Sequence, residues 1–199
     1  MSSEVEIANA ALTLLGESRI SSLDDDVKAA REIKAMFTIS RDALLAAYNW
    51  SFAKARASLL SDVAVPPFGF GIQYTLPSDC LRILLINEVY VGVDLTDYRG
   101  QPTEIYSIEG RKILTDLGAP LLLRYVTRVT DTTQFAAPFT KAFAGQLAED
   151  TCEAITQSDS KRERAIQYKH KALSDAIRAN AIELPPQKLA DDEWLVSRL

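Results

Sequence analysis

Nine residues, VAVPPFGFG at positions 63–71, decide how this sequence is organised. Before them the apolar residues recur at helical spacing, and after them period-two alternation and continuous apolar runs take over. The prolines and glycines interrupt helix, because proline lacks a backbone donor and both residue types favour turns. The stretch therefore predicts a change from helix to strand at Val63.

A first helix is marked at both of its ends. Ser3 and Glu6 have the spacing of a capping box, in which each side chain bonds a free amide of the first turn. Gly16 suits the left-handed residue that often follows the last helical turn. Between them, apolar residues recur at helical spacing, so we expect a helix that ends at Leu15.

A second helix is predicted from about Val27 to about Tyr48. The adjacent carboxylates of Asp24, Asp25 and Asp26 precede it, and we expect them to cap its amides, since they lack the spacing of a calcium loop. Its apolar stripe is broad, which predicts burial on more than one side. The stripe consists of Ala30, Ile33, Met36, Phe37, Ile39, Ala43, Leu44 and Tyr48, and Trp50 and Phe52 should anchor the helix end in the core.

Strands and then two more helices follow the nine residues. The strand candidates are 73–76, 81–88, 104–108, 112–115 and 121–129, with a hairpin turn at Glu109-Gly110. Their connections are too short for helical crossovers, so the sheet should be antiparallel. A third helix should begin at about Pro138, and a fourth, capped by Ser158 or Asp159, should bury a stripe of Ile166, Leu173 and Ile177.

The expected fold is mainly α with a β insertion (α+β), a four-helix bundle-like domain interrupted by a small antiparallel β module. The two helical halves must pack together to bury their stripes. We assign residues 1–62 and 131–184 to the helical bundle, 63–130 to the inserted β-rich module and 185–199 to a C-terminal arm.

Composition restricts the function. The 199 residues carry a net charge of −5, whereas proteins that grip DNA through its phosphates are usually basic somewhere. The best basic stretch lies on the fourth helix, at Lys161, Arg162, Arg164, Lys169, Lys171 and Arg178, and a solvated face explains it better than a nucleic-acid contact. We expect no signal peptide, no membrane span and synthesis in the cytoplasm. Cys80 and Cys152 should be buried, reduced thiols.

No catalytic, cofactor-binding or metal-binding residues are assigned. The single histidine, His170, is expected to be a hydrogen-bonded structural residue on the apolar stripe of the fourth helix. The sequence has no phosphate-binding loop and no zinc-ligand cluster. Glu149, Asp150 and Glu153 lie close together on the third helix and leave an alternative open, a carboxylate pair that cleaves peptidoglycan.

The C-terminal arm is the candidate interface. Trp194, Leu195, Val196 and Leu199, with Arg198 among them, would expose an aromatic and several aliphatic side chains in water. Aromatic anchors are typical of protein interfaces. The alternative, that the arm folds back onto its own subunit, is equally compatible with the composition.

Several motifs occur together in one order along the chain. They are Asn9-Ala10-Ala11-Leu12, Leu14-Leu15-Gly16-Glu17 with Ile20, Leu23-Asp24-Asp25, Arg41-Asp42-Ala43-Leu44-Leu45, Asn49-Trp50-Ser51-Phe52-Ala53, Arg56, the segment 74–82 (YTLPSDCLR), and Trp194-Leu195 with Arg198. In this order and spacing the sequence resembles the tail tubular protein A family of podoviruses, the head-to-tail adaptors or gatekeepers. The resemblance covers nearly the whole chain, although residues 87–130 match only in character.

The resemblance implies a structural virion protein and not an enzyme. Such adaptors assemble as a dodecameric ring between the portal protein and the tail nozzle, a tubular protein B-like partner, and some contact tail fibres. Double-stranded DNA passes through the ring without sequence-specific binding, and no cofactor is implied. Such a protein would be found in the host cytoplasm during assembly and then in the virion, at the head-tail junction.

Overall fold

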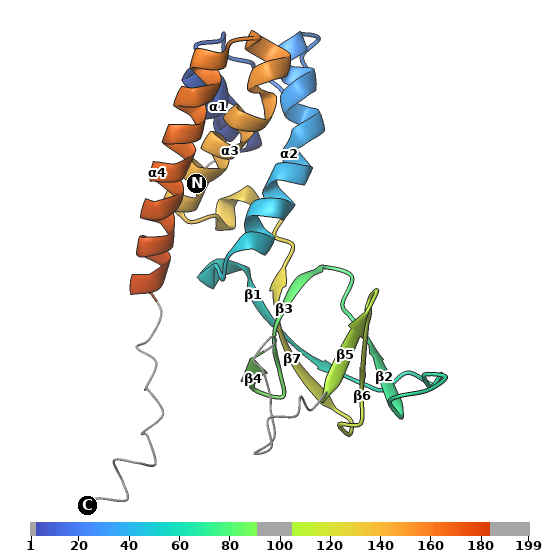
Figure 1. Cartoon of the computed structure of the whole chain (residues 1–199). Coiled ribbons are helices and arrows are strands. Elements are labelled where there is room, and N and C mark those ends of the chain that lie inside the picture. Colours follow the sequence, from blue (N-terminus) through green and yellow to red (C-terminus); the bar gives the residue numbers. More distant parts are fainter. Residues whose placement is uncertain (1–2, 91–104, 184–199) are drawn as a thin grey trace, which may run out of the picture.

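A computed structural model describes residues 3–90 and 105–183, which form helices at one end of the molecule and β-sheets at the other (Figure 1). This is the expected α+β fold, in which two helices precede the strands and two follow them. The helices are α1 (Glu4–Leu15), α2 (Lys28–Ala47), α3 (Ala137–Thr156) and α4 (Asp159–Ile182), with short 3-10 turns η1 (Ser51–Ala53) and η2 (Thr132–Gln134). The strands are β1 (Lys54–Leu59), β2 (Ile72–Thr75), β3 (Cys80–Ile86), β4 (Val89–Tyr90), β5 (Tyr106–Glu109), β6 (Lys112–Thr115) and β7 (Leu121–Thr127).

The predicted ends of α1 are confirmed. The Ser3 hydroxyl accepts a hydrogen bond from the Glu6 amide at 3.2 Å, and the Glu6 carboxylate accepts one from the Ser3 amide at 2.8 Å. Gly16 follows the last turn with φ of +67°, a conformation that disfavours residues with a Cβ. Local sequence therefore determines both ends of this helix.

The predicted capping of α2 by the three aspartates is wrong. Val27 occupies the cap position, without a side-chain hydrogen bond. Asp25 instead accepts hydrogen bonds from the amides of Ser21 and Ser22, and so closes the turn before the helix. Asp24 and Asp26 form exposed ion pairs with Lys34 and Arg31 of α2, respectively. The carboxylates still favour the helix electrostatically, but they leave its first amides uncapped.

The bundle core lies around α3, which packs against α1, α2 and α4. As predicted, the helical halves on either side of the strands share one core. Edge-to-face aromatic contacts run through it, with ring centroids 5.0 Å apart for Phe37 and Phe143 and for Trp50 and Phe139. The Trp50 indole also donates to the Leu44 carbonyl at 2.9 Å, so this side chain anchors the end of α2 as expected.

The buried stripe of α4 differs from the prediction. Ala165, Ala172 and Ala176 face the core, whereas Ile177 is 37% exposed. The reason is a close approach of α3 and α4: a Cβ added at Gly145 would lie 3.0 Å from the Cα of Lys169. Only small residues fit between helices at this distance, so the larger residues of α4 are displaced to its flank.

The strands form two antiparallel sheets in place of the single sheet expected. One has the order β1-β7-β3-β4 and the other β2-β6-β5. All five predicted strands are present, with ends within two residues of the prediction, and β5 and β6 form the predicted hairpin, which turns at Gly110. A second core lies within this module; it is formed by Tyr74, Leu76, Cys80, Ile86, Ile113, Leu121, Leu123 and Tyr125.

The predicted start of the β module at residue 63 is wrong. Strand β1 already begins at Lys54 and pairs along its whole length with β7. Its inward positions are Ala55, Ala57 and Leu59, and two alanines give a weak apolar alternation that reveals little in the sequence. The module therefore joins the bundle directly through η1. In the part of the chain that the structure describes, no helix has the length and apolarity needed to span a membrane.

Candidate assembly surfaces

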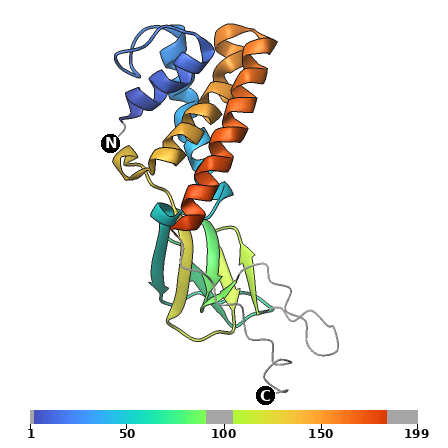
Figure 2. The same cartoon turned by 90° about the vertical axis from the view of Figure 1, so that its left-hand side faces the viewer.

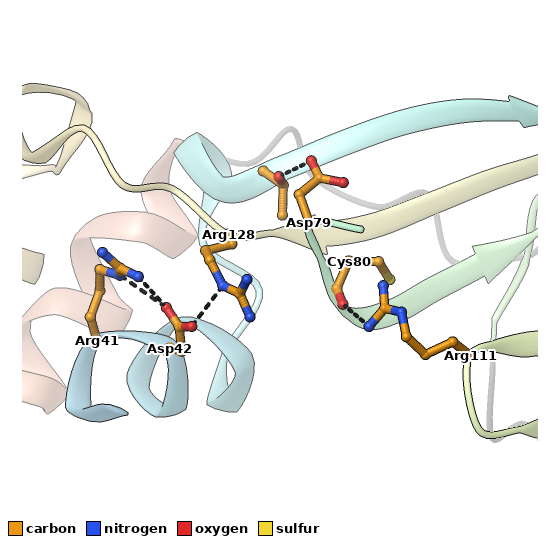
Figure 3. Close-up of polar contacts among 7 residues, drawn as sticks. Arg41, Asp42, Asp79, Cys80, Arg111 and Arg128 are labelled. Carbon is orange, nitrogen blue, oxygen red and sulfur yellow. Dashed lines mark hydrogen bonds and ion pairs between the residues drawn. The ribbon is translucent and has the colours of Figure 1, made fainter. Parts of the chain in front are cut away.

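A polar junction holds the β module against the bundle (Figure 3). Asp42 of α2 accepts hydrogen bonds from Arg41 Nε at 2.9 Å and from Arg128 Nε at 2.7 Å, just after β7. The Arg41 side chain is only 6% exposed, so its charge depends on this carboxylate for compensation. Beside it, Arg82 of β3 donates to the Asn49 side chain at 2.5 Å. These contacts fix the orientation of the two parts of the molecule.

A second group of polar contacts organises the start of β3. Asp79 accepts a hydrogen bond from the Thr127 hydroxyl at 2.7 Å, and Arg111 donates to the Cys80 carbonyl (Figure 3). Arg111 also donates to the Pro77 carbonyl. The Cys80 thiol is buried, and this burial raises its pKa. Arg111, in the β5–β6 turn, thereby joins the two sheets. The raised pKa of Cys80 disfavours the reactive thiolate.

Two of the three carboxylates considered for peptidoglycan cleavage, Glu149 and Asp150, contact different helices. Glu149 forms an ion pair with Lys169 of α4. Asp150 accepts hydrogen bonds from Ser40 of α2 at 2.5 Å and from Gln146 at 2.8 Å. The two side chains therefore contact helices on different sides of α3, where they support packing. Glu153, one turn after Glu149, is exposed.

The charged residues of α4 are divided between packing and solvent. Lys161 pairs with Glu17 at 3.3 Å and Lys169 pairs with Glu149, while Arg162, Arg164, Lys171 and Arg178 are exposed. This division agrees better with a solvated helix face than with a continuous basic surface.

The expectation of a structural, hydrogen-bonded His170 is wrong, since this side chain is exposed beside a surface groove.

The β1–β2 loop presents several apolar side chains to solvent. Phe68 is 86% exposed, and three aliphatic residues of the loop are also exposed: Leu60, Val63 and Val65. The base of the loop is fixed, because Asp62 accepts from Lys112 at 2.8 Å and Asp116 accepts from the Gly71 amide at 2.7 Å. Residues 63–71, which predicted the change from helix to strand, thus form an exposed apolar loop tip whose base is held by hydrogen bonds.

A surface groove separates the C-terminal half of α4 from the end of α2. Its two adjoining parts have volumes of about 460 Å³ and about 290 Å³. The lining is mainly apolar and includes Tyr48, Leu173, Ile177 and Ala181. Of the two residues expected to lie in the core, Ile177 is therefore exposed, whereas Leu173 is partly buried and packs against the bundle core beside the groove.

Sequence reasoning missed both the loop tip and the groove. The sequence 63–71 predicted only the end of the helical region. Its apolar residues Val63, Val65 and Phe68, in a stretch rich in turn residues, were a signal for an exposed apolar loop. The predicted interface residues Trp194, Leu195, Val196, Arg198 and Leu199 lie outside the described residues.

The described ranges 3–90 and 105–183 contain no candidate metal site. No three histidine, cysteine or carboxylate side chains in these ranges are grouped in a way that could hold a metal ion. Cys80 and Cys152 are free and buried, as predicted.

In comparisons with known proteins, no family model and no curated protein matches the chain.

Proposed function

We propose that this chain is the head-to-tail adaptor of a short-tailed phage or prophage, a structural virion protein that forms a ring between portal and tail nozzle and extends the DNA channel. The ordered series of adaptor motifs along the sequence supports this proposal. The structural observation that carries it is the anchored apolar β1–β2 loop, because an exposed apolar patch of this kind is typical of a protein contact.

The two proposed contacts belong to segments that are far apart in the sequence. The β1–β2 loop projects from one side of the β module, at the right of Figure 1. The C-terminal arm, residues 185–199, follows α4 of the bundle in the chain. An adaptor must bind two partners at once, so two separate segments suit it. We assign the arm to the portal and the loop tip to the nozzle.

The alternative of a muralytic enzyme is less well supported. It requires two carboxyl groups on either side of a substrate bond, separated by a defined distance. Glu149 and Asp150 are instead engaged by Lys169 and Ser40 of neighbouring helices. Clearing of peptidoglycan by the purified chain, lost in Glu149→Gln and Glu153→Gln, would restore this alternative.

Binding of the full-length chain to its portal and nozzle tests the proposal. Deletion of residues 187–199 should abolish portal binding and leave nozzle binding intact. Phe68→Ser should weaken nozzle binding by at least about tenfold, the equivalent of about 1.4 kcal/mol. Leu122→Ser is the matched control, since Leu122 is also an exposed apolar residue of the β module but lies outside the loop. Failure of the intact chain to bind either protein would refute the proposal.

A further inference from the structure

A surface pocket of about 480 Å³ lies between the first turn of α3 and the middle of α4. The two helices run antiparallel, side by side, in both views of the molecule (Figures 1 and 2), and the pocket opens where the start of α3 meets α4. Its lining combines apolar and charged residues: Ala137, Pro138, Lys141, Tyr168, Lys171, Ala172 and Asp175. Tyr168 is 37% exposed, so part of the apolar wall faces solvent.

Two lysines give this pocket a positive rim. Lys141 and Lys171 are exposed, and within the described residues neither has an ion-pair partner. The first turn of α3 has no side-chain cap, so the helix dipole adds partial positive charge beside them. Asp175, the single carboxylate of the lining, lies nearer the end of α4. The pocket therefore suits a segment that carries carboxylates next to an apolar anchor.

The C-terminal arm of the chain has this chemistry. Residues 191–193 are Asp, Asp and Glu, and they directly precede Trp194 and Leu195. The order of the charges fits as well. Lys188 comes before the carboxylates, so an arm that turns back along α4 brings its lysine to Asp175 before its carboxylates reach the two lysines of the rim.

The arm is long enough to reach the pocket of its own chain. At about 1.5 Å per residue, Ala172 lies ~17 Å back along α4 from Glu183. The same number of residues separates Glu183 from Trp194, and in an extended chain they span up to ~36 Å. A narrow cleft that is lined in part by Glu183 shares Pro138 with the pocket, so the pocket is continuous with the end of α4. The excess length allows the chain to reverse its direction after the helix.

We propose that the pocket between α3 and α4 holds residues 191–195 of the same chain. Trp194 packs against Tyr168. The carboxylates before it lie beside Lys141 and Lys171. A tethered segment has an effective concentration of about millimolar, so even an open pocket of this kind is occupied. The contact covers apolar side chains of the arm in the free chain, and it does not depend on the proposed adaptor function.

Cysteine cross-linking within the full-length chain tests this contact. The variant Ala137→Cys/Ser197→Cys places one thiol on the pocket wall and one three residues after Trp194. Treated with a short bismaleimide at low protein concentration, it should form a rapid cross-link within the monomer, identified by peptide mass spectrometry. The native cysteines are buried and should not react.

Ile39→Cys/Ser197→Cys is the matched control. The broad apolar stripe of α2 was expected to be buried on more than one side, but Ile39 is 62% exposed, and it does not line the pocket. A thiol at this position is therefore accessible to an arm that samples the surface at random. Its cross-link should form at least about tenfold more slowly than that of the pocket variant.

Charge reversal distinguishes the pocket from a random encounter. Added to the pocket cysteine variant, Lys141→Glu/Lys171→Glu should lower the initial rate of cross-linking at least about threefold. Further addition of Asp191→Lys/Asp192→Lys should restore the rate. Arg178→Glu is the control for charge, since Arg178 is exposed on α4 outside the pocket, and it should leave the rate unchanged.

The outcomes separate this contact from the adaptor function. Equal rates for the pocket variant and the Ile39 control would overturn the contact, and so would a charge-reversed pocket that reacts at the parent rate with an unchanged circular dichroism spectrum. Cross-linked dimers in place of monomers would overturn the assignment to the same chain. The cross-linking needs no portal. Rapid cross-linking by a chain that binds no portal would therefore support the contact and refute the adaptor function.

Discussion

Replacement of Asp42 by asparagine tests the polar junction between bundle and β module. The variant keeps the shape of the side chain and one acceptor oxygen but removes the charge that compensates Arg41 and Arg128. Breaking a fully buried ion pair costs about 3–5 kcal/mol. Because the side chains of Asp42 and Arg128 are 20% and 44% exposed, solvent screens part of this loss. We therefore expect Asp42→Asn to lower the free energy of unfolding by about 2 kcal/mol.

Urea unfolding followed by far-ultraviolet circular dichroism measures this loss. At ~2–4 °C for each kcal/mol, the melting temperature should also fall by about 4–8 °C. Arg128→Met removes only the exposed partner and should cost less than about 1 kcal/mol. Asp26→Asn breaks an exposed pair with Arg31 and should have no measurable effect. A loss in Asp42→Asn no larger than that in Arg128→Met would refute the assignment of Arg41 as a charge that depends on Asp42.

Three further predictions concern packing, pH and a buried hydrogen bond. Gly145→Ala should destabilise the chain by about 1–3 kcal/mol in urea unfolding, because its Cβ would crowd the α4 backbone, whereas Gly118→Ala, with open space around it, should be neutral. The hydrogen bond from Lys112, followed by that from a threonine hydroxyl, holds the pKa of Asp62 below its usual 3.8. Its stabilising contribution is therefore complete above that value and is lost as pH falls through the folded pKa, so the stability gap between wild type and Asp62→Asn should close in acid. Trp50→Phe leaves a buried carbonyl of α2 without its donor and should cost about 1–3 kcal/mol on thermal unfolding, and an unchanged melting temperature would contradict this.

Local signals made part of the fold predictable. The capping box at Ser3 and the left-handed Gly16 act within a few residues, so they predict α1 correctly. Strand β1 was missed because its inward residues Ala55 and Ala57 are small, and its place in the sheet depends on distant pairing with β7.

The face of α4 was predicted wrongly for a related reason. Hydrophobicity favours Ile177 over alanine as a core residue, but the approach of α3 at Gly145 admits only small side chains. That approach depends on the packing of two helices and cannot be deduced from the periodicity of one. The same displacement left the apolar wall of the groove on the surface, so the error in the fold and the missed surface have one cause.

Electron microscopy of the full-length chain mixed with its portal, over a range of molar ratios, tests the central claim most directly. We expect portal rings that carry a closed ring of this chain at one end. Portal rings without additional density at every ratio would contradict the claim.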